Sequence, residues 1–262
     1  MIKIITGFSQ GGGSTVAFIN LTNELNKYGV PCTLYGRHNW HLGRCKSGTM
    51  ADVKLNEDDN IIIHFFEPNW SIKPPIKGNL IYSCHEKDIR PIKSFNYTIY
   101  DKIHYVSKPQ MEWHKIKHPY FILPNIVDKL DHSKCTDKKI AGIIGSIDRN
   151  KQVDISIKRA VEDGMNKILL FGNVSDGVYY KEIMSKYGSI ISHKGHVDDK
   201  QNMYDQITDV YHSSLSETFG LIEKECEMTG VVYHGSEATK NNFDLNMTNE
   251  EIIDEWNKEF IL

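Results

Sequence analysis

The chain has 262 residues, of which 40% are hydrophobic and 25% are charged, the balance of an ordinary globular protein. Its net charge of -3 excludes a generally basic protein, so contact with nucleic acid or an acidic membrane would need a local patch. No apolar run approaches the roughly 18 residues that span a bilayer, so we expect no membrane span. The five cysteines are isolated, without a Cys-x-x-Cys pair, which favours a reducing cytoplasm and argues against structural zinc.

The first segment predicts a strand, a glycine loop, a helix and a second strand. The β-rich run 2–6 leads into the glycine-rich residues 7–15. Apolar side chains at helical spacing then cover residues 18–28, Gly29 marks the helix end, and residues 30–35 supply the next strand. This βαβ unit predicts a parallel sheet. The glycine loop lacks the lysine of a P-loop and does not fit Gly-x-Gly-x-x-Gly, so close approach to a ligand and a simple tight turn both stay open.

Two later strands of the first half end near a histidine. Residues 60–66 form a nearly continuous apolar run with His64 near its end, and residues 80–86 repeat this plan with His85. Because ligands of parallel sheets collect at the carboxyl ends of the strands, we interpret His85 as a site residue. A hydrogen-bonded core histidine is the alternative for His85, and for His64 the two interpretations are equally open.

A second βαβ unit follows a polar connection at residues 129–139. Residues 140–145 form a fresh first strand, and a turn at 146–151 precedes an apolar helical face that ends at Gly164. We therefore expect an α/β protein with two Rossmann-like domains, residues 1–130 and residues 138–262.

The stretch 213–225 carries the strongest functional signal. Glu217 falls in a polar loop, and a helical pattern that begins after Gly220 places Glu225 more than one turn inside a helix. Unpaired backbone N–H groups at such a helix start suit an anion, whereas carboxylates on either side accept hydrogen bonds from hydroxyls. A nucleotide-sugar, with central phosphates and hydroxyls at both ends, fits this pattern. Surface glutamates at an ordinary loop-to-helix junction are the alternative.

This stretch resembles the two-glutamate motif of retaining nucleotide-sugar glycosyltransferases with the GT-B fold, the family 4-like group. The matching positions are Ser214, Glu217, Phe219, Gly220, Leu221 and Glu225. The last four are expected to bind the donor. The resemblance extends from Gly12 to about Val232, over several elements in the family's order. It implies two Rossmann-like domains facing a cleft, with the donor mainly on the second and the acceptor mainly on the first. The amphipathic pattern at residues 249–262 would then be a terminal helix that crosses back onto the first domain.

The resemblance also implies where the donor binds. The first motif glutamate, Glu217, would address the transferred sugar, and the second, Glu225, the ribose. Gly12 and Gly13 match glycines that lie under the donor phosphates in the family. Gly195 ends a predicted strand at the position where the family sets the nucleotide base against main chain.

The implied reaction is hexosyl transfer, from a UDP-sugar in the first place, with the anomeric configuration kept and no cofactor. Lys151 falls on the lysine that clamps the diphosphate, but Ser146 stands at the arginine position, so Arg149 is offered as the second cation. No Asp-x-Asp element is present, and we expect no metal. His85 matches a histidine close to the sugar. The catalytic set is therefore His85, Glu217 and Lys151, with the leaving phosphate taking the acceptor proton.

Acceptor and protein class stay open at this point. A saccharide or a lipid-linked glycan is common in the family, while basic residues in 37–54 and 90–93 also allow a hydroxymethylated base of phage DNA, in a host cytoplasm. An NAD-dependent enzyme is a second class, and it predicts an acidic residue at the end of the second strand. The chain has Tyr35-Gly36-Arg37 there and supplies none. A non-catalytic protein that binds nucleotide-sugars or carbohydrates is the remaining class, allowed by the short second half.

Overall fold

The computed structural model describes residues 1–7, 13–37, 43–65, 73–86, 96–135, 139–239 and 246–260. The chain divides into two compact units, Met1–Val127 with Phe243–Leu262, and Asp128–Asn242. The second unit thus begins ten residues before the expected residue 138. It ends at Asn242, because the last helix packs on the first unit. No described helix is both long and apolar enough to cross a membrane.

The first unit is built on a parallel sheet of seven described strands in the order β3-β2-β1-β4-β5-β6-β7. The strands are β1 Ile2–Thr6, β2 Cys32–Gly36, β3 Ser47–Thr49, β4 Asn60–His64, β5 Leu80–Cys84, β6 Lys102–Tyr105 and β7 Tyr120–Ile122. Its helices are α1 Gly13–Lys27, α3 Lys108–His114 and α8 Asn249–Phe260, with short 3-10 turns Met50–Asp52 and Tyr97–Ile99.

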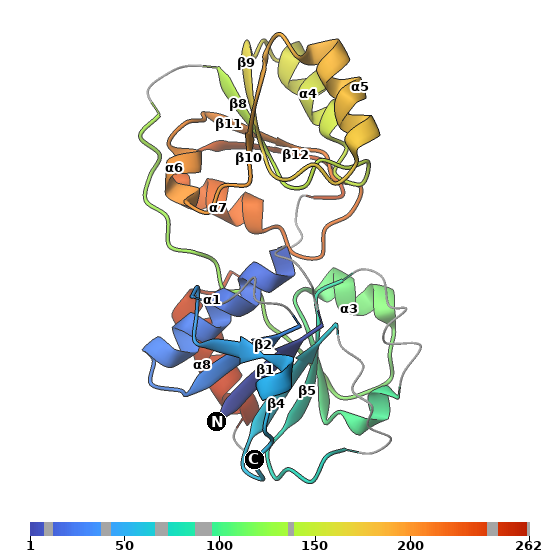
Figure 1. Cartoon of the computed structure of the whole chain (residues 1–262), viewed down its shortest axis with the longest axis vertical. Coiled ribbons are helices and arrows are strands. Elements are labelled where there is room, and N and C mark those ends of the chain that lie inside the picture. Colours follow the sequence, from blue (N-terminus) through green and yellow to red (C-terminus); the bar gives the residue numbers. More distant parts are fainter. Residues whose placement is uncertain are drawn as a thin grey trace. The chain divides into compact units, whose positions relative to one another are not determined.

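The two faces of this sheet follow from the alternation of side chains along each strand. Ile4 of β1 and Ile62 of β4 pack under α1 and α8, in one cluster with the fully buried Trp256. Ile61 and Ile63 point to the opposite face, where α3 lies (Figure 1). Both faces are covered, which explains why the central strands are nearly continuous apolar runs.

The second unit holds a parallel sheet of five described strands in the order β10-β9-β8-β11-β12. The strands are β8 Ile140–Ile144, β9 Lys167–Phe171, β10 Ile191–Gly195, β11 Asp209–His212 and β12 Val232–Gly235. Its helices are α4 Val153–Glu162, α5 Gly177–Tyr187, α6 Lys200–Tyr204 and α7 Leu221–Thr229. Helices α4 and α5 cover one face, and α6 and α7 cover the other (Figure 1).

The order of the strands creates a topological switch point between β8 and β11. The chain runs outward from β8 through β9 to β10 and then returns to the other side of β8 as β11. The loops after β8 and β11 therefore leave the sheet toward opposite faces, which is where open parallel sheets bind their ligands. The expected α/β class, with a parallel sheet in each half, is confirmed.

Two glycines allow the loops after β8 and β9 to pass each other closely. Gly145 and Gly172 have φ angles of +129° and +148°, a region that side chains disfavour. A Cβ atom on Gly172 would lie 1.9 Å from the carbonyl oxygen of Gly145. The Gly172 N–H also donates to the Gly195 carbonyl at 2.7 Å, so the ends of β8, β9 and β10 are linked at this edge.

We predict that Gly172→Ala lowers the free energy of unfolding by about 2 to 4 kcal/mol, because the new methyl group meets backbone that cannot yield. Urea denaturation monitored by circular dichroism measures the change. Gly177→Ala is the matched control, since a Cβ there meets nothing within 4 Å. Equal stability of the two variants would contradict the close passage of these loops.

Candidate functional site

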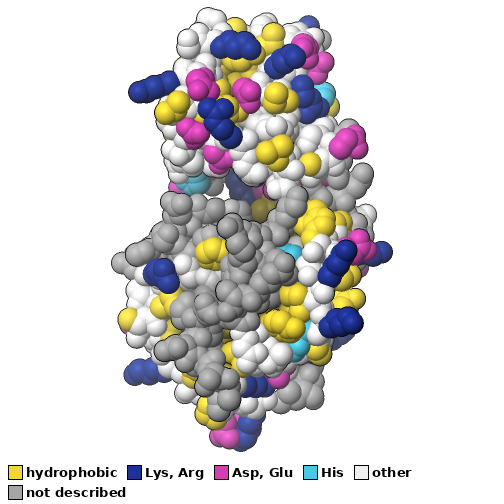
Figure 2. Space-filling model, turned by 90° about the vertical axis from the view of Figure 1, so that its right-hand side faces the viewer, with side chains coloured by type: hydrophobic (Ala, Val, Ile, Leu, Met, Phe, Trp, Pro, Cys, Tyr) yellow, Lys and Arg dark blue, Asp and Glu magenta, His cyan; other side chains and the backbone are white. Residues whose placement is uncertain are grey.

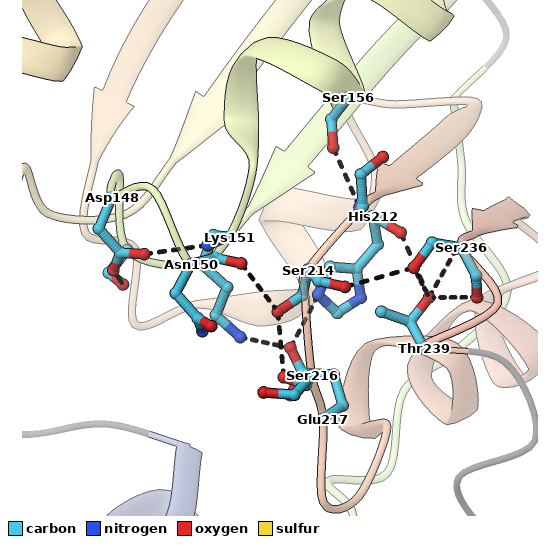
Figure 3. A network of polar contacts seen from close by, with 12 residues as sticks. Asp148, Asn150, Lys151, Ser156, His212, Ser214, Ser216, Glu217, Ser236 and Thr239 are labelled. Atoms are coloured by element: carbon cyan, nitrogen blue, oxygen red, sulfur yellow. Dashed lines mark hydrogen bonds and ion pairs between the residues drawn. The ribbon is translucent and has the colours of Figure 1, made fainter.

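The loops after β8 and β11 are joined at the switch point by one backbone hydrogen bond and one contact from a side-chain hydroxyl. The Leu215 N–H donates to the Asn150 carbonyl at 2.9 Å, and the Ser214 hydroxyl approaches the same oxygen at 3.5 Å. On its other side the β11 loop is held by Ser236, whose hydroxyl donates to the Ser214 carbonyl at 3.3 Å (Figure 3). These bonds fix the loop that carries Glu217.

Glu217 is the centre of a polar network (Figure 3). Its Oε1 accepts from Lys151 Nζ at 2.5 Å and from His212 Nε2 at 3.0 Å. The opposite ring nitrogen of His212 lies 3.1 Å from the Tyr233 hydroxyl. A carboxylate only accepts hydrogen bonds, so the Nε2 of His212 carries a hydrogen and donates it to Glu217. The structure therefore brings together two of the predicted catalytic residues, Lys151 and Glu217.

The surroundings of Glu217 keep it ionised. Burial by itself would raise its pKa, but the hydrogen bond from His212 and the charge of Lys151 outweigh burial and lower the pKa from 4.5 to about 2. At neutral pH the side chain is an acceptor-only carboxylate. It can accept from sugar hydroxyls or stabilise positive charge, and it has no proton to give as a general acid.

Local geometry positions Lys151 at the end of the β8 loop. The Asp148 carboxylate accepts from the Lys151 N–H at 3.0 Å. Gln152, the next residue, caps α4 in the left-handed region with φ 45° and ψ 50°. Such a conformation costs a non-glycine residue about 1 kcal/mol or more and is concentrated at functional sites.

Arg149 does not join this network. It donates to the Glu182 carboxylate at 3.0 and 3.2 Å, its Nε lies 3.6 Å from Asp176, and its guanidinium stands over the Tyr179 ring at 4.9 Å. These partners belong to α5 or to its N-cap. Arg149 is close to Lys151 in the sequence, but in the structure the guanidinium of Arg149 binds acidic and aromatic side chains on one face of α5.

Glu225 lies in a second cluster, on α7, with 3% of its surface exposed. Its Oε1 accepts from Lys200 Nζ at 2.6 Å and its Oε2 from the Tyr204 hydroxyl at 2.7 Å. Burial would lower the pKa of Lys200, but the charges of Glu225 and Asp128, which is 2.5 Å from the ammonium, raise it. An ionised carboxylate has about four acceptor positions, so two of those on Glu225 are used by Lys200 and Tyr204.

The turn between the two glutamates is built as the sequence suggested. Phe219 is 8% exposed, Gly220 is the N-cap of α7, and Leu221 is its first residue. Glu223, which sequence analysis did not consider, lies in the first helical turn. A carboxylate in the first turn interacts favourably with the positive end of the helix dipole but repels a phosphate. An anionic ligand at this helix end would therefore share the positive end of the dipole with the Glu223 side chain.

The predicted glycines lie at the ends of other elements. Gly195 ends β10 with a φ of +70°, and Gly13 is the first residue of α1. Gly12 lies outside the described residues.

His85, the third predicted catalytic residue, belongs to the first unit, where it directly follows β5 and is 6% exposed. Its ring lies 4.6 Å from the ring of Phe18 and 5.1 Å from that of His64, between ring centroids. Burial, with smaller contributions from His64 and His104, lowers the pKa of His85 well below its ordinary value. The ring is therefore neutral at pH 7.

Sequence analysis missed His212, Tyr233 and Lys200. His212 ends β11, so the rule that singled out His85 at a strand end would also have found it. Tyr233 and Lys200 meet their partners only through the folding of separate elements. In the described part of the chain, no three His, Cys, Asp or Glu side chains are grouped as metal ligands.

No protein-family model matches the chain, and no curated protein sequence does either. Solved structures do. HepE from Anabaena, solved with UDP-glucose, is 12% identical over 98% of this chain and 88% of its own, with a TM-score of 0.67. WaaG, a glycosyltransferase of lipopolysaccharide biosynthesis, is 10% identical over 99% and 90%, with a TM-score of 0.63. AviGT4, a glycosyltransferase of avilamycin A biosynthesis, is 13% identical over 97% and 87%, with a TM-score of 0.61. At these identities the similarity establishes the fold: the chain has the α/β fold of these GT-B glycosyltransferases.

We predict that Glu217→Gln destabilises the protein at neutral pH and makes its stability less sensitive to acid. A lowered pKa contributes stability that is complete above about pH 4.5 and is lost as the pH falls toward 2. The variant should therefore unfold about 2 kcal/mol more easily at pH 7, and the difference from the native chain should shrink between pH 5 and pH 2.

Urea titrations at a series of pH values measure this difference. Glu182→Gln is the control, because the Glu182 side chain is 55% exposed and its pairing with Arg149 should contribute little. A Glu217→Gln deficit that stays constant down to pH 2 would contradict the assigned environment.

Proposed function

We propose that this protein is a retaining glycosyltransferase of the GT-B type, which moves a sugar from a nucleotide-sugar to a hydroxyl group without a metal ion. The observation that carries the proposal is the ionised Glu217, held by Lys151 and His212 at the switch point of the second sheet. The fold match to glycosyltransferases supports it, and the UDP-glucose complex of HepE makes a UDP-sugar the first donor to test.

In this proposal the donor changes the partner of Lys151. Its ammonium is paired with Glu217, and a diphosphate that enters the switch point competes for it. Transfer of the ammonium to the phosphates releases Glu217 Oε1 for hydroxyls of the transferred sugar. As the bond between the anomeric carbon and the phosphate oxygen breaks, its electron pair goes to the phosphate, where Lys151 stabilises the growing charge.

The acceptor oxygen attacks the anomeric carbon from the side that the phosphate leaves, and its proton goes to the leaving phosphate. This front-face substitution keeps the anomeric configuration and needs no nucleophile from the protein. Glu217 then positions the sugar, and the remaining acceptor positions of Glu225 bind ribose hydroxyls. For His85, in the first unit, we propose a hydrogen bond to a substrate hydroxyl. Arg149 is available as a second cation, since its exposed pairs with α5 are worth only about 0 to 1 kcal/mol.

The proposal names a hydroxyl acceptor and no specific polymer. Figure 2 shows Lys and Arg side chains interspersed with Asp and Glu over the face of the second unit that carries α4 and α5. Pairs such as Lys158 with Glu162 and Arg149 with Glu182 lie there. This mixed charge does not favour a polyanion on that face. Of the basic segments that suggested DNA, residues 90–93 lie outside the described residues and 37–54 lie outside them in part.

Incubation with a panel of UDP-sugars and GDP-sugars tests the proposal. We expect slow hydrolysis of at least one donor, and proton NMR should show that the released sugar first appears with the donor's anomeric configuration. Thermal stabilisation by UDP but not by NAD should accompany turnover. Stabilisation by NAD, or inverted product, would reject the proposal.

We predict that Lys151→Met lowers kcat for donor hydrolysis by about 10²- to 10³-fold, because one electrostatic contact to the leaving group is lost. Binding of uridine, which lacks phosphates, should change by less than about threefold. Lys158→Met on α4 is the matched control, with a side chain that is 62% exposed. An unchanged kcat in Lys151→Met, with the fold intact, would remove Lys151 from the site.

A further inference from the structure

A line of buried polar side chains crosses the carboxyl end of the first sheet. Ser83 of β5 and His104 of β6 are direct register partners on adjacent strands, and His85 follows Ser83 on the same side of its strand. The Ser83 Oγ lies 2.7 Å from His104 Nδ1 and 3.1 Å from His85 Nε2. His104 Nε2 lies 2.9 Å from the Leu123 carbonyl oxygen. None of the three polar side chains is more than 6% exposed.

The direction of each hydrogen bond follows from one fixed end. The Leu123 carbonyl only accepts, so the Nε2 of His104 carries a hydrogen. Burial lowers the pKa of His104 to about 4, so its ring is neutral at pH 7 and its Nδ1 is a lone pair. Ser83 must therefore donate its single hydrogen to His104. Its oxygen then accepts from His85, which places the hydrogen of His85 on Nε2.

We propose that His104 and Ser83 are positioning residues that hold His85 in the tautomer with the hydrogen on Nε2, so that Nδ1 accepts a hydrogen bond from a substrate hydroxyl. That this substrate is a nucleotide-sugar rests on the proposed function. The hydrogen-bonded chain from the Leu123 carbonyl through His104 and Ser83 to His85, which we call the relay, does not depend on the proposed function.

The relay has a consequence for specificity. A lone pair on Nδ1 accepts from a hydroxyl but repels a carboxylate or carbonyl oxygen. A site built to pair with a hydroxyl discriminates strongly against an analogue that lacks it, because a buried polar group is then left without its partner. Around this ring stand Phe18 of α1 and His64 of β4, and His64 Nε2 is bonded to Glu86 at 3.2 Å. Neither neighbour supplies another hydrogen-bonding route to Ser83.

The tautomer can be read directly from two-bond proton–nitrogen NMR spectra of the full chain labelled with ¹⁵N-histidine. Protonated and unprotonated ring nitrogens give distinct signals. We expect His85 to show a protonated Nε2 and an unprotonated Nδ1 in the native chain. In Ser83→Ala the Nε2 signal should shift to a mixture of tautomers, and Ser83→Thr, which keeps the hydroxyl, should restore the native pattern.

Cys84→Ala is the matched control, because Cys84 is equally buried on β5 and points to the other face. In donor hydrolysis, Ser83→Ala should raise KM for the nucleotide-sugar about tenfold and leave the Kd of UDP unchanged, since only a sugar contact is lost.

A hydrogen on Nδ1 of His85 in the native chain, or a tautomer unaffected in Ser83→Ala, overturns the relay. The native spectrum decides alone if the alanine variant does not fold. If the protein turns over no nucleotide-sugar, the proposed function fails, while the spectra still decide whether the relay exists.

Discussion

The loops at the switch point of the second unit are organised around Glu217, a largely buried side chain that the structure keeps ionised. Taking Glu217 out of water is costly, and the structure offsets this cost with a lysine from the β8 loop and a histidine at the end of β11. Because the loops after these two adjacent strands leave toward opposite faces of the sheet, the interaction also ties the loops together, next to the hydrogen bond between Leu215 and Asn150. The Lys151–Glu217 ion pair therefore serves both the stability of the unit and the candidate chemistry. A ligand that binds Lys151 in place of Glu217 must supply interactions that offset the lost stabilisation of the pair.

The two motif glutamates follow one plan. Each has a lysine from another element, Lys151 for Glu217 and Lys200 for Glu225, and each has an aromatic hydroxyl in its cluster, since Tyr233 reaches Glu217 through His212 and Tyr204 bonds Glu225 directly. The lysines neutralise the carboxylates without using all of their acceptor positions. A ligand that brings phosphates and hydroxyls together can exchange with both kinds of partner, whereas a purely anionic or purely neutral ligand can exchange with only one.

Much of the architecture could be predicted because it depends on local patterns. Apolar runs such as 60–64 fixed the parallel strands, and the break at Gly220 placed Glu217 in a loop and Glu225 in a helix. The contacts that could not be predicted from the sequence are those between side chains of different helices and strands. Arg149 is engaged by α5, since the acidic and aromatic side chains it contacts are adjacent only once that helix has formed. The apolar face of the last helix and its return to the first domain were expected, but not which side chains of the first unit Trp256 would pack against. His104 gave no signal at all, because its role in the relay depends on the register of β5 and β6.

The most direct test of the account is a crystal structure of the protein with a non-hydrolysable UDP-sugar. The account predicts that Lys151 Nζ contacts a phosphate oxygen and that Glu217, released from it, accepts from a hydroxyl of the sugar. A bound donor that leaves the Lys151–Glu217 pair intact, with its phosphates elsewhere, would contradict the central claim.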